Sequence, residues 1–212
     1  MGWRLSGSTV DAEVDTTFQA LRVTIRPFQV IGWQSLGAKT GSITSIAANS
    51  PIFSLRQIAT TLLVIRRMSI GFLTTSAFSL GQIMDFSLNV ARGFTASDSG
   101  GTTISFSGNN SKHRTSLTTL SSTDCRISTT AALTNGTKTL DTTALAIAGG
   151  FSSGLGSTIQ VNNDNLFSSN TGDYPLVLSQ NEGINISNIT LMGALGIGVA
   201  YVNIELAEAN SY

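Results

Sequence analysis

Apolar and polar residues alternate along much of this chain. The clearest case is residues 84–91, and the same period of two recurs over residues 21–26 and 199–206. Successive side chains of a β-strand point to opposite faces, so this period is typical of a strand with one buried face. The pattern predicts that the chain is built largely from strands.

Residues 61–72 begin with a run that is apolar at both even and odd positions, which fits either a strand covered on both faces or a helix segment. The β-branched residues and the nearby Gly71 favour a central strand. Shorter strands are predicted at residues 42–46, 51–57, 102–107, 140–148, 157–161, 176–179 and 184–190.

Clusters of Gly, Asn, Asp and Ser separate these candidates and predict turns. They lie at residues 97–101, 108–111, 135–136, 149–150 and 162–165, and residues 193–198 are interpreted as a flexible hairpin connection. We find no amphipathic helix of normal length and no repeat of fixed period. Many short strands with frequent turns predict an all-β fold, as an antiparallel sandwich or a jelly-roll-like domain.

The domain organisation follows from where the periodicity begins. Residues 1–15 show no periodicity and are expected to form an extended N-terminal arm. Residues 16–212 are expected to form a single β-rich domain, since all-β domains of about this length commonly form one unit.

Charge is scarce and balanced. Charged residues make up 11% of the chain, with 12 basic and 12 acidic residues, against roughly 25% in an ordinary soluble protein. A surface with so little net charge is poorly protected against association, so the protein is expected to work in an assembly, as a homo-oligomer such as a dimer or trimer. The balance argues against nucleic acid as the principal partner, because phosphate binding needs a clustered basic excess.

The charges are unevenly distributed, with basic residues in excess up to Ile70 and acidic residues in excess beyond it. Chance and solvated strand faces are one explanation of this uneven distribution. The alternative hypothesis is that the basic residues form a surface that binds an acidic partner. The single Cys125 excludes an intrachain disulfide. The N-terminus lacks the apolar stretch of a secretory signal, and no run of about 18 apolar residues predicts a membrane span.

The sequence motifs predict no catalytic or metal chemistry. Ser152 lies in a G-x-S-x-G pattern, but the only histidine, His113, precedes it, whereas hydrolases with this motif have their histidine after the serine. One imidazole is a poor basis for a metal site, so His113 is interpreted as an exposed or hydrogen-bonded loop residue. Residues 162–165 offer oxygen ligands without EF-hand spacing and are interpreted as an Asx-rich turn. We therefore predict no enzyme activity, no catalytic residues, no metal and no cofactor.

Two segments carry a resemblance to a known family. One begins Asn89-Val-Ala-Arg-Gly-Phe-Thr-Ala-Ser-Asp-Ser-Gly-Gly-Thr102 and continues to residue 134, and the other is Pro175-Leu-Val-Leu-Ser-Gln-Asn-Glu-Gly183 with the closing strand that ends at Glu208. Over roughly residues 85–212 the chain resembles virion-associated proteins encoded by tailed bacteriophages. The resemblance implies a β-rich structural protein of the virion, made in the host cytoplasm and located on the capsid surface.

The function expected on this basis is that of a capsid decoration or cement protein, which binds the major capsid protein and stabilises the head shell. The hypothesis assigns shell contact to the N-terminal arm of residues 1–15, which includes Trp3 and Arg4, together with Arg22 and Arg26 beyond it. The first alternative is a receptor- or carbohydrate-binding β-module of a tail or fibre. The second is an esterase that uses Ser152.

Overall fold

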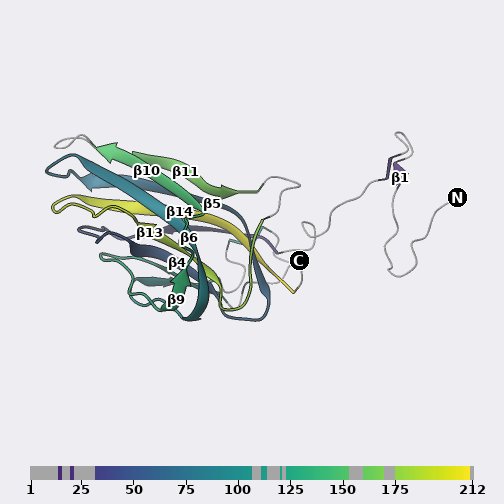
Figure 1. Cartoon of the computed structure of the whole chain (residues 1–212). Coiled ribbons are helices and arrows are strands. Elements are labelled where there is room, and N and C mark those ends of the chain that lie inside the picture. Colours follow the sequence, from purple (N-terminus) through teal and green to yellow (C-terminus); the bar gives the residue numbers. More distant parts are fainter. Residues whose placement is uncertain are drawn as a thin grey trace. The chain divides into compact units, whose positions relative to one another are not determined.

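The computed structural model describes residues 14–15, 20–21, 32–106, 111–113, 120, 123–152, 160–169 and 175–210. Within these ranges the chain forms strands and contains no helix, so none that could cross a membrane. Two antiparallel sheets pack face to face as a sandwich (Figure 1). The predicted all-β antiparallel sandwich is confirmed.

The larger sheet has seven strands in the order β10-β6-β13-β4-β8-β7, and β9 also pairs with β6. Its long central strand is β6, Gln82–Ala96. The other strands are β4 (Ser50–Gln57), β7 (Thr102–Ile104), β8 (Thr123–Ile127), β9 (Thr137–Leu140), β10 (Ala146–Ser152) and β13 (Gly183–Asn188).

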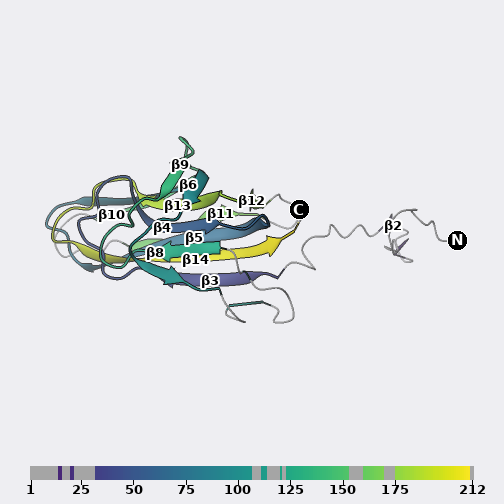
Figure 2. The same cartoon turned by 90° about the horizontal axis from the view of Figure 1, so that it is seen from below.

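The smaller sheet has five strands in the order β11-β5-β14-β3, and β12 also pairs with β5. Its strands are β3 (Gln34–Lys39), β5 (Leu62–Ser76), β11 (Gln160–Ser168), β12 (Leu176–Leu178) and β14 (Ile197–Ala209). Figure 2 shows β3 beside β14, the pair that joins the first and last strands of the sandwich.

The core fills the space between the two sheets with the apolar residues that alternate along each strand. Even-numbered residues of β6 from Met84 to Leu88 are fully buried, while the odd-numbered ones between them face outward. The rings of Phe86 in β6 and Phe72 in β5 have centroids 5.7 Å apart, so they join the two sheets directly. Aromatic pairs at this separation add to the stabilisation from burial alone.

Several predicted strands are confirmed. Residues 84–91 lie in β6, residues 199–206 in β14 and residues 51–57 in β4. Residues 61–72 fall almost entirely within β5, which has neighbours on both sides and is a central strand as predicted.

Other predictions were wrong. Residues 42–46 hold only an isolated bridge between Ile43 and Gly198, and residues 140–148 are split between β9 and β10. The predicted turn at residues 149–150 lies inside β10. A Cβ on Gly149 would come within 3.3 Å of the Asp85 Cβ, so close approach of neighbouring strands explains the glycine there.

Two further predictions are corrected in the smaller sheet. Residues 162–165, predicted as a turn, lie in β11, where the pairing with β5 shifts register between Val161 and Asp164 and so absorbs extra residues. Residues 193–198 do not form a hairpin, because β13 and β14 belong to different sheets.

Near the N-terminus, β1 (Val14–Asp15) pairs with β2 (Ala20–Leu21) in antiparallel fashion. The contacts within the chain group Met1–Val30 and Ile31–Tyr212 as separate compact units. The strand predicted at residues 21–26 lies outside the described residues beyond Leu21.

Candidate functional site

The four predicted shell-contact residues, Trp3, Arg4, Arg22 and Arg26, all lie outside the described residues. The sandwich itself has three features that could serve a function. They are an apolar patch at one edge of the larger sheet, a polar network that includes a buried Lys–Asp pair, and a polar groove on the smaller sheet.

The apolar patch lies on the outer face of β6 and β10. Ile83 and Phe151 are direct cross-strand partners, and Ile147 lies four residues before Phe151 on the same face. Ile147 and Phe151 expose 67% and 66% of their surface, although Ala148 between them is buried. We call Ile83, Ile147 and Phe151 the edge patch.

Further exposed leucines lie on the two loops nearest to the edge patch. Leu80 belongs to the loop before β6, and Leu191 and Leu195 belong to the loop between β13 and β14. Gln82 ties the second loop to β6, because its Nε2 donates to the Leu191 carbonyl at 3.1 Å and its Oε1 accepts from the Gly193 amide at 2.9 Å. The apolar surface therefore continues around this end of the sandwich.

The edge patch offers almost no charge to a partner. Strand β10 contains no charged residue. Asp85 in β6 is engaged within the protein, since its carboxylate accepts hydrogen bonds from the Thr190 amide at 2.8 Å and the Thr190 hydroxyl at 3.1 Å. A partner for this surface needs apolar groups and no compensating charges.

Strand β10 is also the last strand of the larger sheet in the part of the chain that the structure describes. Edge strands are usually protected from association by Lys, Pro or bulges. The sequence of β10, Ala-Ile-Ala-Gly-Gly-Phe-Ser, contains neither Lys nor Pro. An exposed apolar face on such a strand is typical of an association surface.

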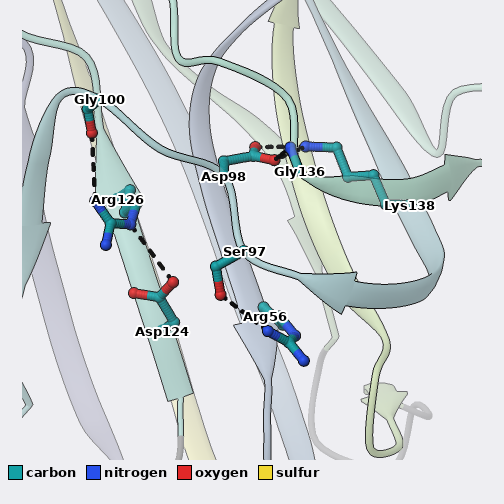
Figure 3. A network of polar contacts seen from close by, with 8 residues as sticks. All are labelled: Arg56, Ser97, Asp98, Gly100, Asp124, Arg126, Gly136 and Lys138. Atoms are coloured by element: carbon teal, nitrogen blue, oxygen red, sulfur yellow. Dashed lines mark hydrogen bonds and ion pairs between the residues drawn. The ribbon is translucent and has the colours of Figure 1, made fainter.

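The polar network fixes the loop between β6 and β7 over the outer face of the larger sheet (Figure 3). Asp98 is its centre: its carboxylate accepts from both Lys138 Nζ and the Gly136 amide, at 2.5 and 2.7 Å to Oδ1. Arg56 donates to the Ser97 hydroxyl at 3.0 Å. The turn predicted at residues 135–136 was wrong: this segment runs antiparallel beside the end of β6, between the Ser99–Thr134 bridge and the Ala96–Thr137 pair, and that pairing brings the Gly136 amide to the carboxylate.

Lys138 and Asp98 are buried, with 3% and 0% of their side-chain surfaces exposed. Burial lowers the pKa of Lys138, while its hydrogen bond and charge interaction with Asp98 oppose that shift. Lys138 Nζ also lies 4.8 Å from the centre of the Phe94 ring and donates to Asn185 Oδ1 at 3.1 Å. Removing one partner from a buried ion pair leaves an uncompensated charge, so this cluster is costly to disrupt.

The polar groove, of about 380 Å³, lies on the outer face of the smaller sheet and is lined by residues of β3, β5 and β14. Beside it His113 is partly exposed, with its Nε2 2.5 Å from the Ser35 hydroxyl, as the interpretation of a hydrogen-bonded histidine expected. Its Nδ1 lies 3.8 Å from Glu205 Oε1, which is too far for a hydrogen bond. Glu205 pairs instead with Arg66 at 3.4 Å, so the carboxylate does not orient the imidazole as a catalytic triad requires.

The remaining sequence motifs do not form a catalytic or metal site in the part of the chain that the structure describes. Ser152 is the last residue of β10, opposite Gln82, and its motif glycine Gly150 lies within the same strand. The strand–turn–helix setting of a nucleophile elbow is not found there in the described part of the chain. Among the described residues no three His, Cys, Asp or Glu side chains are placed to hold a metal ion.

Sequence reasoning missed both the edge patch and the buried Lys–Asp pair. The alternation of β10 was hidden by its glycines, which were interpreted as a turn. Comparison of the chain with protein-family models, with curated proteins and with solved structures finds no match.

Proposed function

We propose that this protein is a structural component of a bacteriophage virion, a decoration or cement protein that binds the major capsid protein on the head shell as a homo-oligomer. The edge patch is the observation that carries this proposal. It gives a chain with little charge a specific place to associate. The resemblance of residues 85–212 to virion-associated proteins supplies the biological setting.

The strand order supports the proposal. We infer a jelly roll from the pairing of the eight longest strands, which form one set in the order β3-β14-β5-β11 and a second in the order β4-β13-β6-β10. The chain thus passes repeatedly from one sheet to the other. Jelly rolls are common in viral capsid proteins, but they also occur in lectins and cupins, so the fold alone does not decide the function.

A second copy of this chain is the occupant that best fits the edge patch. An uncharged apolar surface can meet an identical surface without burying an unpaired charge, which would oppose association. Closed rotational symmetry, with the same patch used by each copy, is the usual form of such assemblies.

The oligomer is tested by placing a charge in the edge patch. Ile147→Lys should convert the oligomer to a monomer in analytical ultracentrifugation, because a lysine would be buried without a partner in the interface. Its circular-dichroism spectrum should stay that of the wild type, since Ile147 is exposed in the monomer.

Ile58→Lys is the matched control. Ile58 is another exposed isoleucine, and it lies just after the end of β4. Near that end, Arg56 of β4 pairs with Gly183 of β13, which pairs in turn with Ala91 of β6. Ala91 lies toward the opposite end of β6 from Ile83, so Ile58 is away from the edge patch. This variant should keep the wild-type mass in solution. A wild-type protein that is monomeric at every concentration would contradict the proposed self-association.

Shell binding is tested by cosedimentation with empty shells assembled from the major capsid protein. The number of wild-type copies bound to each shell should stand in a fixed, symmetric ratio to the number of shell subunits. Purified virions that carry only a few copies, together with binding to defined glycans in a glycan array, would instead favour the tail or fibre module.

A further inference from the structure

Three side chains from distant parts of the sequence come together at β9, where one of them donates hydrogen bonds to the other two. They are Lys138 of β9, Asp98 of the loop after β6, and Asn185 of β13. Ile184 and Ile186 of β13 are in the core, so Asn185 lies on the outer face of the sheet, yet it is fully buried. We call these three residues the amide cluster.

We propose that Lys138 and Asn185 become joined by an intramolecular isopeptide bond, with Asp98 as the group that transfers protons. The geometry assigns each role. Lys138 Nζ, the nucleophile, donates to the Asn185 side-chain carbonyl at 3.1 Å, so it lies next to the carbon that it would attack. Asp98 Oδ1 is 2.5 Å from the same nitrogen and is positioned to accept its proton.

The surroundings hold the reacting groups in place. The Asn185 amide nitrogen donates to the Ser187 hydroxyl at 2.6 Å, which turns the carbonyl oxygen toward Lys138. The Gly136 amide donates to Asp98 and fixes that carboxylate. Holding two reactants in contact within one fold replaces a bimolecular encounter and can remove a large part of the barrier.

Burial favours the neutral amine that the reaction needs. Lys138 is removed from water and lies beside the Phe94 ring, and desolvation lowers its pKa. An amine that has given its proton to Asp98 carries a free electron pair on Nζ. A buried lysine activated in this way is a known route to nucleophilic catalysis.

The proposed step needs no co-reactant. The Nζ electron pair forms a bond to Cγ of Asn185, and the bond from Cγ to the Asn185 amide nitrogen breaks. Of the three protons on the original ammonium group, one stays on the new amide and two pass to the departing nitrogen, one of them by way of Asp98. The nitrogen leaves as ammonium, Asp98 returns to the carboxylate, and no atom is oxidised or reduced.

The product would tie β9 covalently to β13 and enclose residues 138–185 in a closed loop. Such a crosslink restricts the unfolded chain, as a disulfide does, without requiring an oxidising compartment. The inference concerns the sandwich alone and is independent of the proposed shell binding.

The test is the mass of the wild-type protein, measured after denaturation. The intact mass should fall below the sequence mass by one ammonia molecule, allowing for removal of Met1. Trypsin should not cut after Lys138, and tandem mass spectrometry should find the peptides that contain Lys138 and Asn185 joined. Because the measurement uses the wild type, it does not depend on any variant folding.

Variants check the assignment of roles. Lys138→Arg, Asn185→Ala and Asp98→Asn should each restore the full sequence mass, whereas the control Lys39→Arg, at an exposed residue of β3, should keep the deficit. A wild-type mass equal to the sequence mass, with normal cleavage after Lys138, would overturn the proposal. So would an ammonia deficit without joined peptides, which would place the loss elsewhere, for example at Asn135.

Discussion

At the scale of single residues, the loop after β6 depends on two adjacent glycines with different surroundings. Gly100 has φ +77° and Gly101 has φ +60°, a region that L side chains rarely adopt. A Cβ on Gly101 would lie 2.2 Å from the Ile127 carbonyl oxygen, whereas a Cβ on Gly100 would meet nothing within 4 Å. The two positions therefore separate backbone strain from steric overlap.

We expect Gly100→Ala to lower the free energy of unfolding by about 1–2 kcal/mol, the cost of the left-handed conformation. Gly101→Ala should lower it by a further ~1–3 kcal/mol, because backbone must move to relieve the overlap. Urea denaturation followed by circular dichroism measures both values. Equal losses for the two variants would contradict the close approach of Gly101 to β8.

Residue-scale features were predictable only where the signal was local. The bend at Gly100 and Gly101 lies within the turn predicted at residues 97–101, because glycine favours turns by itself. The amide cluster could not, since Asp98, Lys138 and Asn185 are brought together only by the pairing of β6, β9 and β13. Similarly, no spacing rule links His113 to Ser35.

At the scale of elements, the sequence predicted the strands that have a strong apolar alternation and missed those that depend on their neighbours. β6 and β14 carry the alternation over many residues. β3 contains Gly37 and no β-branched residue, and it is a strand because it pairs with β14 along its whole length. Residues 149–150 and 162–165 have turn-like compositions, but pairing with β6 and β5 overrides them.

Cys125 provides a probe of one such missed element, β8. It lies opposite Leu55 of β4 and Ile104 of β7, and it is fully buried. Burial raises the pKa of its thiol well above the ordinary value, and the charge of Asp124 raises it further. The thiol is therefore protonated at neutral pH in the folded protein, and the reactive thiolate is scarce.

We expect iodoacetamide to label Cys125 slowly in native buffer and rapidly in urea. Raising the pH from 7 to 9 should speed labelling of the unfolded protein, whose thiol has an ordinary pKa of roughly 8.5, and leave the folded protein slow. Mass spectrometry of timed samples measures the rates. Rapid labelling under native conditions would show that β8 opens readily from β4 and β7.

At the scale of the whole molecule, the class of fold followed from the sequence but the strand order did not. Alternation shows that a residue lies in a strand with one buried face, and it carries no information about which strand lies beside it. β3 and β14 are the first and last strands of the sandwich in the sequence, and they pair with each other in the smaller sheet. Between them, the chain passes back and forth between the two sheets. Such long-range pairing is set by the packing of the complete core.

The division of the chain leads to a prediction about shell binding. The core residues of the sandwich all belong to the unit Ile31–Tyr212, and Met1–Val30 forms a separate unit. Deleting residues 1–30 should therefore leave the melting temperature and the number of copies in the oligomer unchanged. The deletion removes Trp3, Arg4, Arg22 and Arg26, so it should abolish cosedimentation with the shells if these residues make the contact.

The double variant Arg22→Gln and Arg26→Gln refines this test within the full-length chain. If the two guanidinium groups meet an acidic shell surface, binding of the wild type should weaken as salt is raised from 50 to 500 mM, because screening shortens the range of the attraction. The double variant should bind more weakly and depend less on salt. A truncated protein that binds shells as fully as the wild type would contradict this assignment and move the contact to residues 31–212.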